Sequence, residues 1–163
     1  MCGIGGFYNP TGSKTPVGNI ASLWCGLEDR GTHAHGMAFN WVNSDKPVVY
    51  KKVGAATKSK SMVKKYLSGK NLRYVLLHTR FTTQGSTQNM YNNHPIVRDG
   101  ITLTHNGVLR NDRQVFNQLN VKPIGEVDTE VINAALRHKG VKWTSEKIQG
   151  SMSIAWIDEK DST

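Results

Sequence analysis

The stretch that decides the fold is the first one, Met1-Cys2-Gly3-Ile4-Gly5-Gly6-Phe7-Tyr8, in which a cysteine follows the initiator methionine. Once that methionine is removed, Cys2 carries a thiol and a free α-amine on one residue. The amine can then act as the base that takes the thiol proton. Ile4, Phe7 and Tyr8 favour a short strand with the nucleophile at its tip. The alternative is an incidental cysteine beside a start methionine.

Length and composition fit one α/β domain with a real core. The chain has 163 residues, of which 37% are hydrophobic, as is typical of a globular protein. Its two cysteines, Cys2 and Cys25, exclude a disulfide framework and a four-cysteine zinc site. The sequence shows no secretory leader and no run of about 20 apolar residues. We therefore expect a cytoplasmic protein without a membrane partner, in which Cys25 is a packed thiol of a helix.

The net charge of +9 is concentrated in Lys51-Lys52 and in Lys58 to Lys70. One interpretation is a basic patch for nucleic acid, a nucleotide or an acidic partner. The other is the solvated face of an amphipathic helix whose apolar residues, among them Val63 and Leu67, turn inward. We favour the helix, because no RNA-binding signature or zinc-finger spacing accompanies the charge.

Hydrophobic periodicity and turn residues predict strands and helices in a mixed order. The expected strands are 4–8, 36–42, 47–53, 72–78, 101–105 and 152–157, and the expected helices are 20–28, 58–70, 112–119 and 128–137, with a helical turn at 144–149. The apolar segment 72–78 suits a central strand. A turn is expected at Asn106-Gly107, and Asp112 is expected to cap its helix. Without regular βαβ alternation, this order predicts stacked, mainly antiparallel sheets with helices outside.

Polar residues gather in clusters that follow Cys2 along the chain. They are Arg30-Gly31, the octapeptide 78–85 (HTRFTTQG), Asn93-His94-Pro95, His105-Asn106-Gly107 and Asp128-Thr129-Glu130-Val131. An amide hydrolase that acts through cysteine needs donors for an oxyanion, a cation for a substrate carboxylate and an anion for a substrate amine. Asn106 and the Gly107 N–H can supply the donors. Arg80 can bind a carboxylate through two hydrogen bonds, and Asp128 can pair with an ammonium.

Taken in order, these motifs resemble the class II glutamine amidotransferases, the N-terminal-nucleophile glutaminase domains of glucosamine-6-phosphate synthase and glutamine phosphoribosylpyrophosphate amidotransferase. The resemblance runs from Cys2 to about Asp158. It implies an α+β fold, an αββα sandwich of two stacked, mainly antiparallel sheets with outer helices. It also implies that residues 1–163 are a single glutamine amidotransferase type-2 domain, shortened at its C-terminus because later strands and a synthase domain are missing.

The resemblance implies a glutaminase mechanism. Cys2 would be the nucleophile and its α-amine the general base, while Asn106 and the Gly107 N–H would form the oxyanion hole. Attack on the side-chain amide of L-glutamine would release ammonia and leave a γ-glutamyl thioester for water to hydrolyse. No cofactor is implied.

The resemblance also implies how the substrate is held. Arg80 would bind the α-carboxylate of glutamine with help from Thr83 and the backbone near Gln84, and Asp128 would bind the α-ammonium. Arg30 is either a structural ion-pair residue or a residue on the substrate side.

Three histidines, His78, His94 and His105, lie in motif positions that are more often structural than proton carriers. His33-x-His35 could be a metal pair, but an ordinary loop is expected because a third ligand is missing. No metal is therefore expected.

The chain departs from the family pattern at two positions near these motifs. His33 stands where many relatives have an aspartate, and Phe81 where many have a tryptophan. We expect both changes to alter the surroundings of the glutamine pocket. If Met1 stays attached, Cys2 has no free amine and the protein is an inactive precursor or a non-catalytic relative.

Three functions remain open. The first is a small glutaminase that hands ammonia to a separate synthase partner, which would modify a nucleotide or nucleic acid. The second is a catalytically silent amidotransferase-like protein that binds or regulates a partner. The third is a hydrolase of another γ-glutamyl amide, which would use the same residues.

Overall fold

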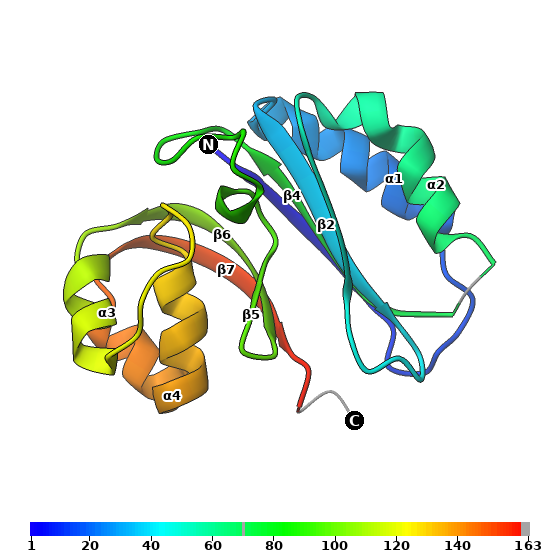
Figure 1. The fold of residues 1–163 in the computed structure, drawn as a ribbon. Helices are drawn as coiled ribbons and strands as arrows, with labels where there is room; N and C mark the ends of the chain where they lie inside the picture. Colours follow the sequence, from blue (N-terminus) through cyan, green and yellow to red (C-terminus); the bar gives the residue numbers. More distant parts are fainter. Residues whose placement is uncertain (70, 161–163) are drawn as a thin grey trace.

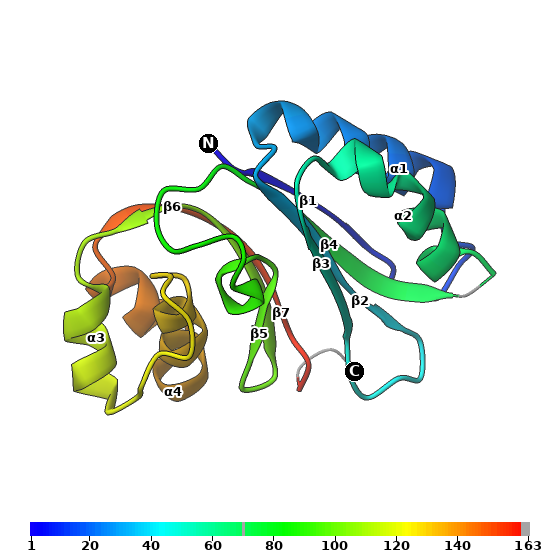
Figure 2. The same ribbon diagram turned by 45° about the horizontal axis from the view of Figure 1, so that its top comes forward.

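A computed structural model, which describes residues 1–69 and 71–160, shows two antiparallel sheets packed between two layers of helices (Figure 1). Figure 2 shows that one helix pair covers the outer face of each sheet. The expected α+β sandwich of αββα type is therefore confirmed. Among the described residues, no helix has both the length and the apolar character needed to cross a membrane.

The first sheet contains the N-terminal half of the chain, with its strands in the order β1-β4-β2-β3. All neighbouring strands pair antiparallel. The strands are β1 (Gly3–Tyr8), β2 (Ala34–Trp41), β3 (Val48–Val53) and β4 (Leu72–Arg80). The helices on this side are α1 (Val17–Gly26), η1 (Leu27–Arg30), η2 (Ala56–Ser59) and α2 (Lys60–Leu67). The central place predicted for segment 72–78 is confirmed, since β4 lies between β1 and β2.

The second sheet is built from the C-terminal half, with its strands in the order β5-β6-β7. The strands are β5 (Ile96–Arg98), β6 (Ile101–Leu109) and β7 (Gly150–Asp158). Its helices are η3 (Met90–Asn92), α3 (Asp112–Leu119) and α4 (Glu130–Lys147). The short β5 was not predicted, because three residues carry too little alternation to indicate a strand.

Two boundaries were predicted wrongly. The strand at 101–105 does not end in a turn at Asn106-Gly107, because β7 keeps pairing with β6 as far as Leu109. Gly107 therefore lies within β6, where it has a φ of 154° and is in close contact with the Ser151 carbonyl. Asn111, rather than Asp112, occupies the N-cap position of helix 112–119, and its side chain makes no capping hydrogen bond.

Gly140 divides α4 into two helical segments. Its φ of 79° and ψ of 176° are not helical, so the chain kinks there, and the second segment continues to Lys147 and includes most of the helical turn expected at 144–149.

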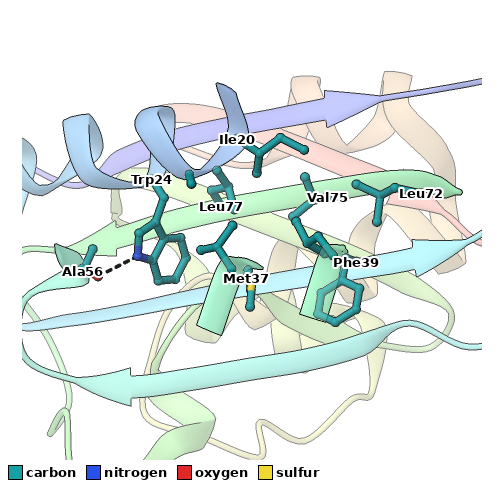
Figure 3. Packing of buried hydrophobic residues seen from close by; sticks show 11 residues of the cluster. Ile20, Trp24, Met37, Phe39, Ala56, Leu72, Val75 and Leu77 are labelled. Carbon is teal, nitrogen blue, oxygen red and sulfur yellow. Dashed lines mark hydrogen bonds between the residues drawn. The ribbon is translucent and has the colours of Figure 1, made fainter. Parts of the chain in front are cut away.

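The core of the first half lies between sheet and helices because strand residues alternate between faces. Met37 and Phe39 of β2 point to the helices, where they pack against Ile20 and Trp24 of α1 (Figure 3). The Trp24 indole N–H donates to the Ala56 carbonyl at 2.6 Å. A second core, between β6, β7, α3 and α4, contains Ile101, Leu103, Val115, Phe116, Val131 and Ile132 among other residues.

The basic stretch forms the outer face of α2. Val63 and Leu67 are buried, whereas Lys60, Lys64 and Lys65 are exposed, as the amphipathic interpretation predicted. Lys70 lies outside the described residues. Cys25 of α1 is half-buried and packs against the same core, as expected.

Three buried histidines lie where the two sheets meet. The rings of His78 and His94 stack with centroids 4.4 Å apart. His94 Nε2 and His105 Nδ1 lie 2.9 and 3.0 Å from one hydroxyl oxygen, Thr129 Oγ1. Burial lowers the pKa of His78 to about 3 and that of His94 well below its ordinary value, so both rings are neutral in the folded protein.

We predict that stability falls as the pH falls below 6.5. The folded-state pKa of His78, about 3, lies below the reference value of 6.5, so the unfolded chain binds more protons between these values. Each such histidine lowers the free energy of unfolding by up to about 1.4 kcal/mol per pH unit. Urea unfolding from pH 8 to 4 measures the slope. His78→Gln should make it shallower, whereas the exposed His138→Gln should not; equal slopes in all three proteins would contradict this assignment.

We predict that Gly36 is required for the two halves to pack. A Cβ at this position of β2 would lie 2.1 Å from the His94 carbonyl oxygen, so Gly36→Ala should cost about 1–3 kcal/mol or more in the free energy of unfolding. The matched control is Gly26→Ala in α1, where no atom lies within 4 Å and alanine should stabilise by up to about 1 kcal/mol. Equal melting temperatures for the two variants would refute the prediction.

Candidate active site

The tips of two neighbouring strands bring Cys2 and Arg80 together. Gly3 pairs with Thr79 in the β1–β4 ladder, so Cys2 lies opposite Arg80, the last residue of β4. Because side chains alternate along a strand, Cys2 and Arg80 point to the same face as Ile4 and its partner His78, the face toward the second sheet. The N-terminus accordingly lies where the two sheets come together (Figures 1 and 2).

The backbone of Phe81 holds the sulfur of Cys2. The Phe81 N–H donates to Cys2 Sγ at 3.4 Å, and the thiol donates to the Phe81 carbonyl oxygen at 3.6 Å. Cys2 is half-buried. The nucleophile predicted from the sequence is thus accessible and lies against two polar backbone groups.

Cys2 also reaches across to the second sheet. Its backbone N–H donates to Asn106 Oδ1 of β6 at 3.1 Å. This contact turns the Oδ1 of Asn106 toward Cys2 and leaves its Nδ2 free to donate elsewhere. Arg30, at the end of η1, reaches the residue before Cys2, with Nη2 lying 3.8 Å from Met1 Sδ.

Gly107 follows Asn106 in β6, and its N–H points to the edge of the strand at which Asp128 lies. Backbone N–H groups alternate in direction along a strand. The Leu109 N–H donates to Asp128 Oδ2 at 2.7 Å, so the Gly107 N–H, two residues earlier, points toward that edge as well. Asn106 and Gly107 can therefore present two donors on the Cys2 side of β6.

Arg80 is buried, with 4% of its surface exposed. Its Nη1 donates to Asn93 Oδ1 at 2.7 Å, and its Nη2 donates to the carbonyls of Gln84 and, at 3.2 Å, of Gly85. Burial lowers the pKa of Arg80, while negative charge on Cys2 and on Asp128 opposes this shift. The guanidinium therefore lies within electrostatic reach of both groups and remains a cation.

Asparagines hold the loop that follows β4. Asn93 Nδ2 donates to the Thr87 carbonyl at 2.8 Å, while its Oδ1 accepts from Arg80. Asn92 Nδ2 donates to the Ser86 carbonyl at 2.9 Å and to Glu126 Oε2 at 2.7 Å. The sequence placed Asn93 in a motif but assigned it no task, and Asn92 was missed. Two adjacent asparagines after a glycine-containing loop were the available signal.

The residues of the acidic segment 128–131 have different hydrogen-bond partners. Asp128 is bound to the end of β6, as described above, and Thr129 contacts the buried histidines. Glu130 accepts from Arg98 Nη1 at 2.8 Å and from the N–H groups of Ile124 and Gly125 at 2.8 and 2.5 Å. Glu130 therefore holds the loop before α4, a role that the sequence did not reveal.

The predicted site residues fall into two groups. The structure brings Cys2 and Arg80, at the tips of β1 and β4, close to Asn106 and Gly107 within β6 and to Asp128 before α4. The side chains of Thr83 and Gln84 are exposed on the neighbouring loop, whereas His94 and His105 lie buried behind the site.

The His33-x-His35 pair has protein partners. His35 Nδ1 lies 2.7 Å from the Gly54 carbonyl oxygen, its Nε2 lies 2.9 Å from Ser59 Oγ, and His33 Nδ1 accepts from the Thr82 N–H at 2.9 Å. In the described part of the chain, no group of three or more histidine, cysteine or acidic residues could hold a metal ion.

Comparison with solved structures gives the fold. Glutamine phosphoribosylpyrophosphate amidotransferase from B. subtilis, complexed with ADP and GMP, matches 98% of this chain with a TM-score of 0.63 and 20% identity. A structure described as the allosteric regulatory enzyme of purine biosynthesis matches the same share with a TM-score of 0.65 and 20% identity. The chain spans only 35% and 36% of these two proteins. A search of curated proteins found no match.

The family follows from a separate comparison. The model of the family described as "Glutamine amidotransferases class-II" matches residues 12–151, which is more than half of the sequence. The matched range contains Arg80, Asn106 and Asp128, and the fold agrees with the solved structures. The chain therefore belongs to the class II glutamine amidotransferases.

Proposed function

We propose that the protein, once Met1 is removed, hydrolyses the side-chain amide of L-glutamine with Cys2 as the nucleophile. The observation that carries this proposal is the hydrogen bond from Cys2 N to Asn106 Oδ1, which joins the thiol residue to the candidate oxyanion donors. Membership of the class II amidotransferases supports glutamine as the substrate.

The α-amine of Cys2 begins the reaction. It takes the thiol proton as the sulfur attacks the amide carbon, and the carbonyl oxygen becomes an oxyanion. Asn106 Nδ2 and the Gly107 N–H donate to that oxyanion. The protonated amine then gives its proton to the leaving nitrogen, so ammonia departs and a γ-glutamyl thioester remains on Cys2.

Water completes the cycle. The free α-amine takes a proton from a water molecule, which attacks the thioester carbon through a second oxyanion held by the same donors. When this intermediate collapses, the C–S bond breaks, glutamate leaves and the sulfur regains its proton from the amine. The two steps consume one glutamine and one water and yield glutamate and ammonia.

Arg80 and Asp128 give the site its preference for an α-amino acid. The Arg80 guanidinium binds the α-carboxylate, and the Asp128 carboxylate binds the α-ammonium. Thr83 and the backbone near Gln84 add donors to the carboxylate, and the carbonyls of Gln84 and Gly85 position Arg80. A pocket with a thiol nucleophile and this pattern of charges also accommodates other γ-glutamyl amides. A panel of such substrates distinguishes them from glutamine.

We also propose that ammonia passes to a synthase partner in the cytoplasm. Free ammonia is mostly ammonium at neutral pH, so useful transfer requires a docked acceptor site. The chain spans about a third of the solved proteins that it matches. Binding of nucleic acid has weaker support, since the lysines of α2 form an ordinary helix surface.

We predict that Cys2 is required for turnover. Methionine-free protein should release glutamate from glutamine, and Cys2→Ala should abolish the release because it removes the thiol that forms the thioester. Cys25→Ala, at the other thiol, should leave the rate within a factor of two. A coupled assay for glutamate measures the rate of each variant, and intact mass reports whether Met1 has been removed. Release of glutamate by Cys2→Ala, or none by methionine-free wild type with a docked partner, would refute the mechanism.

We predict that Arg80 and Asn106 affect different kinetic constants. Asn106→Ala should lower kcat by about 10²–10³-fold, because it removes an oxyanion donor. Arg80→Lys should raise KM by about 10–100-fold, because lysine cannot reproduce the two-pronged carboxylate contact. Steady-state kinetics separates the two effects, with the exposed Arg113→Lys as the matched control. A KM effect from Asn106→Ala with unchanged kcat would reject its place in the oxyanion hole.

A further inference from the structure

His33 and Phe81, the two departures from the family pattern, touch each other in the structure. Their rings stack with centroids 4.8 Å apart and planes inclined by 28°. Phe81 is 47% exposed and His33 is exposed, so the pair lies at the surface. Since the Phe81 backbone contacts Cys2 Sγ, this aromatic pair borders the candidate nucleophile.

Hydrogen bonds tie His33 to the residues around Phe81. Its backbone N–H donates to the Arg80 carbonyl at 3.0 Å, and its own carbonyl accepts from the Gly54 N–H at 2.9 Å. Its ring Nδ1 accepts from the Thr82 N–H at 2.9 Å. The backbone of His33 is thus held between two strand ends, and its ring is held against the peptide that follows Phe81.

That peptide also carries a contact to the sulfur. The Thr82 N–H and the Phe81 carbonyl belong to one peptide plane, in which they point in opposite directions. Holding the N–H on His33 therefore aims the carbonyl toward Cys2 Sγ, 3.6 Å away. The Phe81 N–H, one peptide earlier, lies 3.4 Å from the same sulfur.

We propose that His33 is a positioning residue for Cys2: its imidazole, with Nδ1 as acceptor, orients the Phe81–Thr82 peptide and so holds the Cys2 sulfur in place. This inference rests on the proposed function in naming Cys2 as the nucleophile. His33 acts through the peptide and the stacked ring of Phe81, without touching the substrate.

The test compares His33→Asn, His33→Gln and His33→Ala in a Cys25→Ser background, with His138→Asn as the matched control. Asparagine carries an oxygen on the same carbon as Nδ1, so it can accept from the Thr82 N–H, whereas glutamine places its amide one carbon further out. Two rates are measured in methionine-free protein: glutamine hydrolysis as kcat/KM, and alkylation of Cys2 by iodoacetamide. His33→Ala and His33→Gln should lower both about 3–10-fold, the range expected for one hydrogen bond, and His33→Asn should restore them.

Two results would overturn the proposal: His33→Asn no faster than His33→Ala, or His33→Ala alkylated as fast as wild type or faster. Circular dichroism checks that each variant is folded, and if His33→Ala is not, the comparison of asparagine with glutamine decides. Alkylation needs no turnover. A protein that leaves glutamine untouched but shows the alkylation pattern would refute the proposed function and support the role of His33.

Discussion

The structure of the site depends on one contact between the two sheets, the hydrogen bond from Cys2 N to Asn106 Oδ1. The residues that surround it come from both halves of the chain: Arg80 from the first sheet, and Gly107 and Asp128 from the second half. The bond can form only if the Cys2 nitrogen at the tip of β1 and the Asn106 Oδ1 in the middle of β6 lie about 3 Å apart. The packing of the two sheets is therefore a condition for the chemistry.

The interior between the two sheets contains buried polar side chains, and a few groups provide their hydrogen-bond partners. His78, His94 and His105 are buried there, and Thr129 offers one hydroxyl to two of them. Burying an unpaired polar group is costly, so the Thr129 hydroxyl favours the arrangement of the sheets in which it meets both His94 and His105. Gly36 completes this fit by letting the His94 carbonyl approach the first sheet.

The loops beside Arg80 are fixed by side chains whose importance is structural. Asn93 binds the guanidinium and the loop together, and Asn92 joins that loop to the segment before α4 through Glu126. The carbonyls of Gln84 and Gly85 then complete the cradle around Arg80. A residue that contacts substrate in our proposal is thus held by residues with no chemical step of their own.

The local pattern of apolar and polar residues predicted the fold class correctly. The nearly continuous apolar run at 72–78 predicted a central strand, and the spacing of Val63 and Leu67 predicted the inward face of a basic helix. Both predictions use residues that are near neighbours in the sequence, where local pattern is decisive. The boundary at Asn106-Gly107 was wrong because asparagine and glycine favour a turn locally, whereas pairing with β7 extended the strand.

By itself, the sequence determined the residue chemistry and the kinds of element: a thiol behind a removable methionine, an arginine after a central strand, and strands and helices in an order that stacks into layers. The tertiary structure alone decided which groups meet. It placed Asn106 against Cys2, made His33 the partner of Thr82, and gave Glu130 a loop to hold. These contacts join residues far apart along the chain or on irregular segments. No local periodicity encodes them, because they arise only when whole sheets and loops have packed.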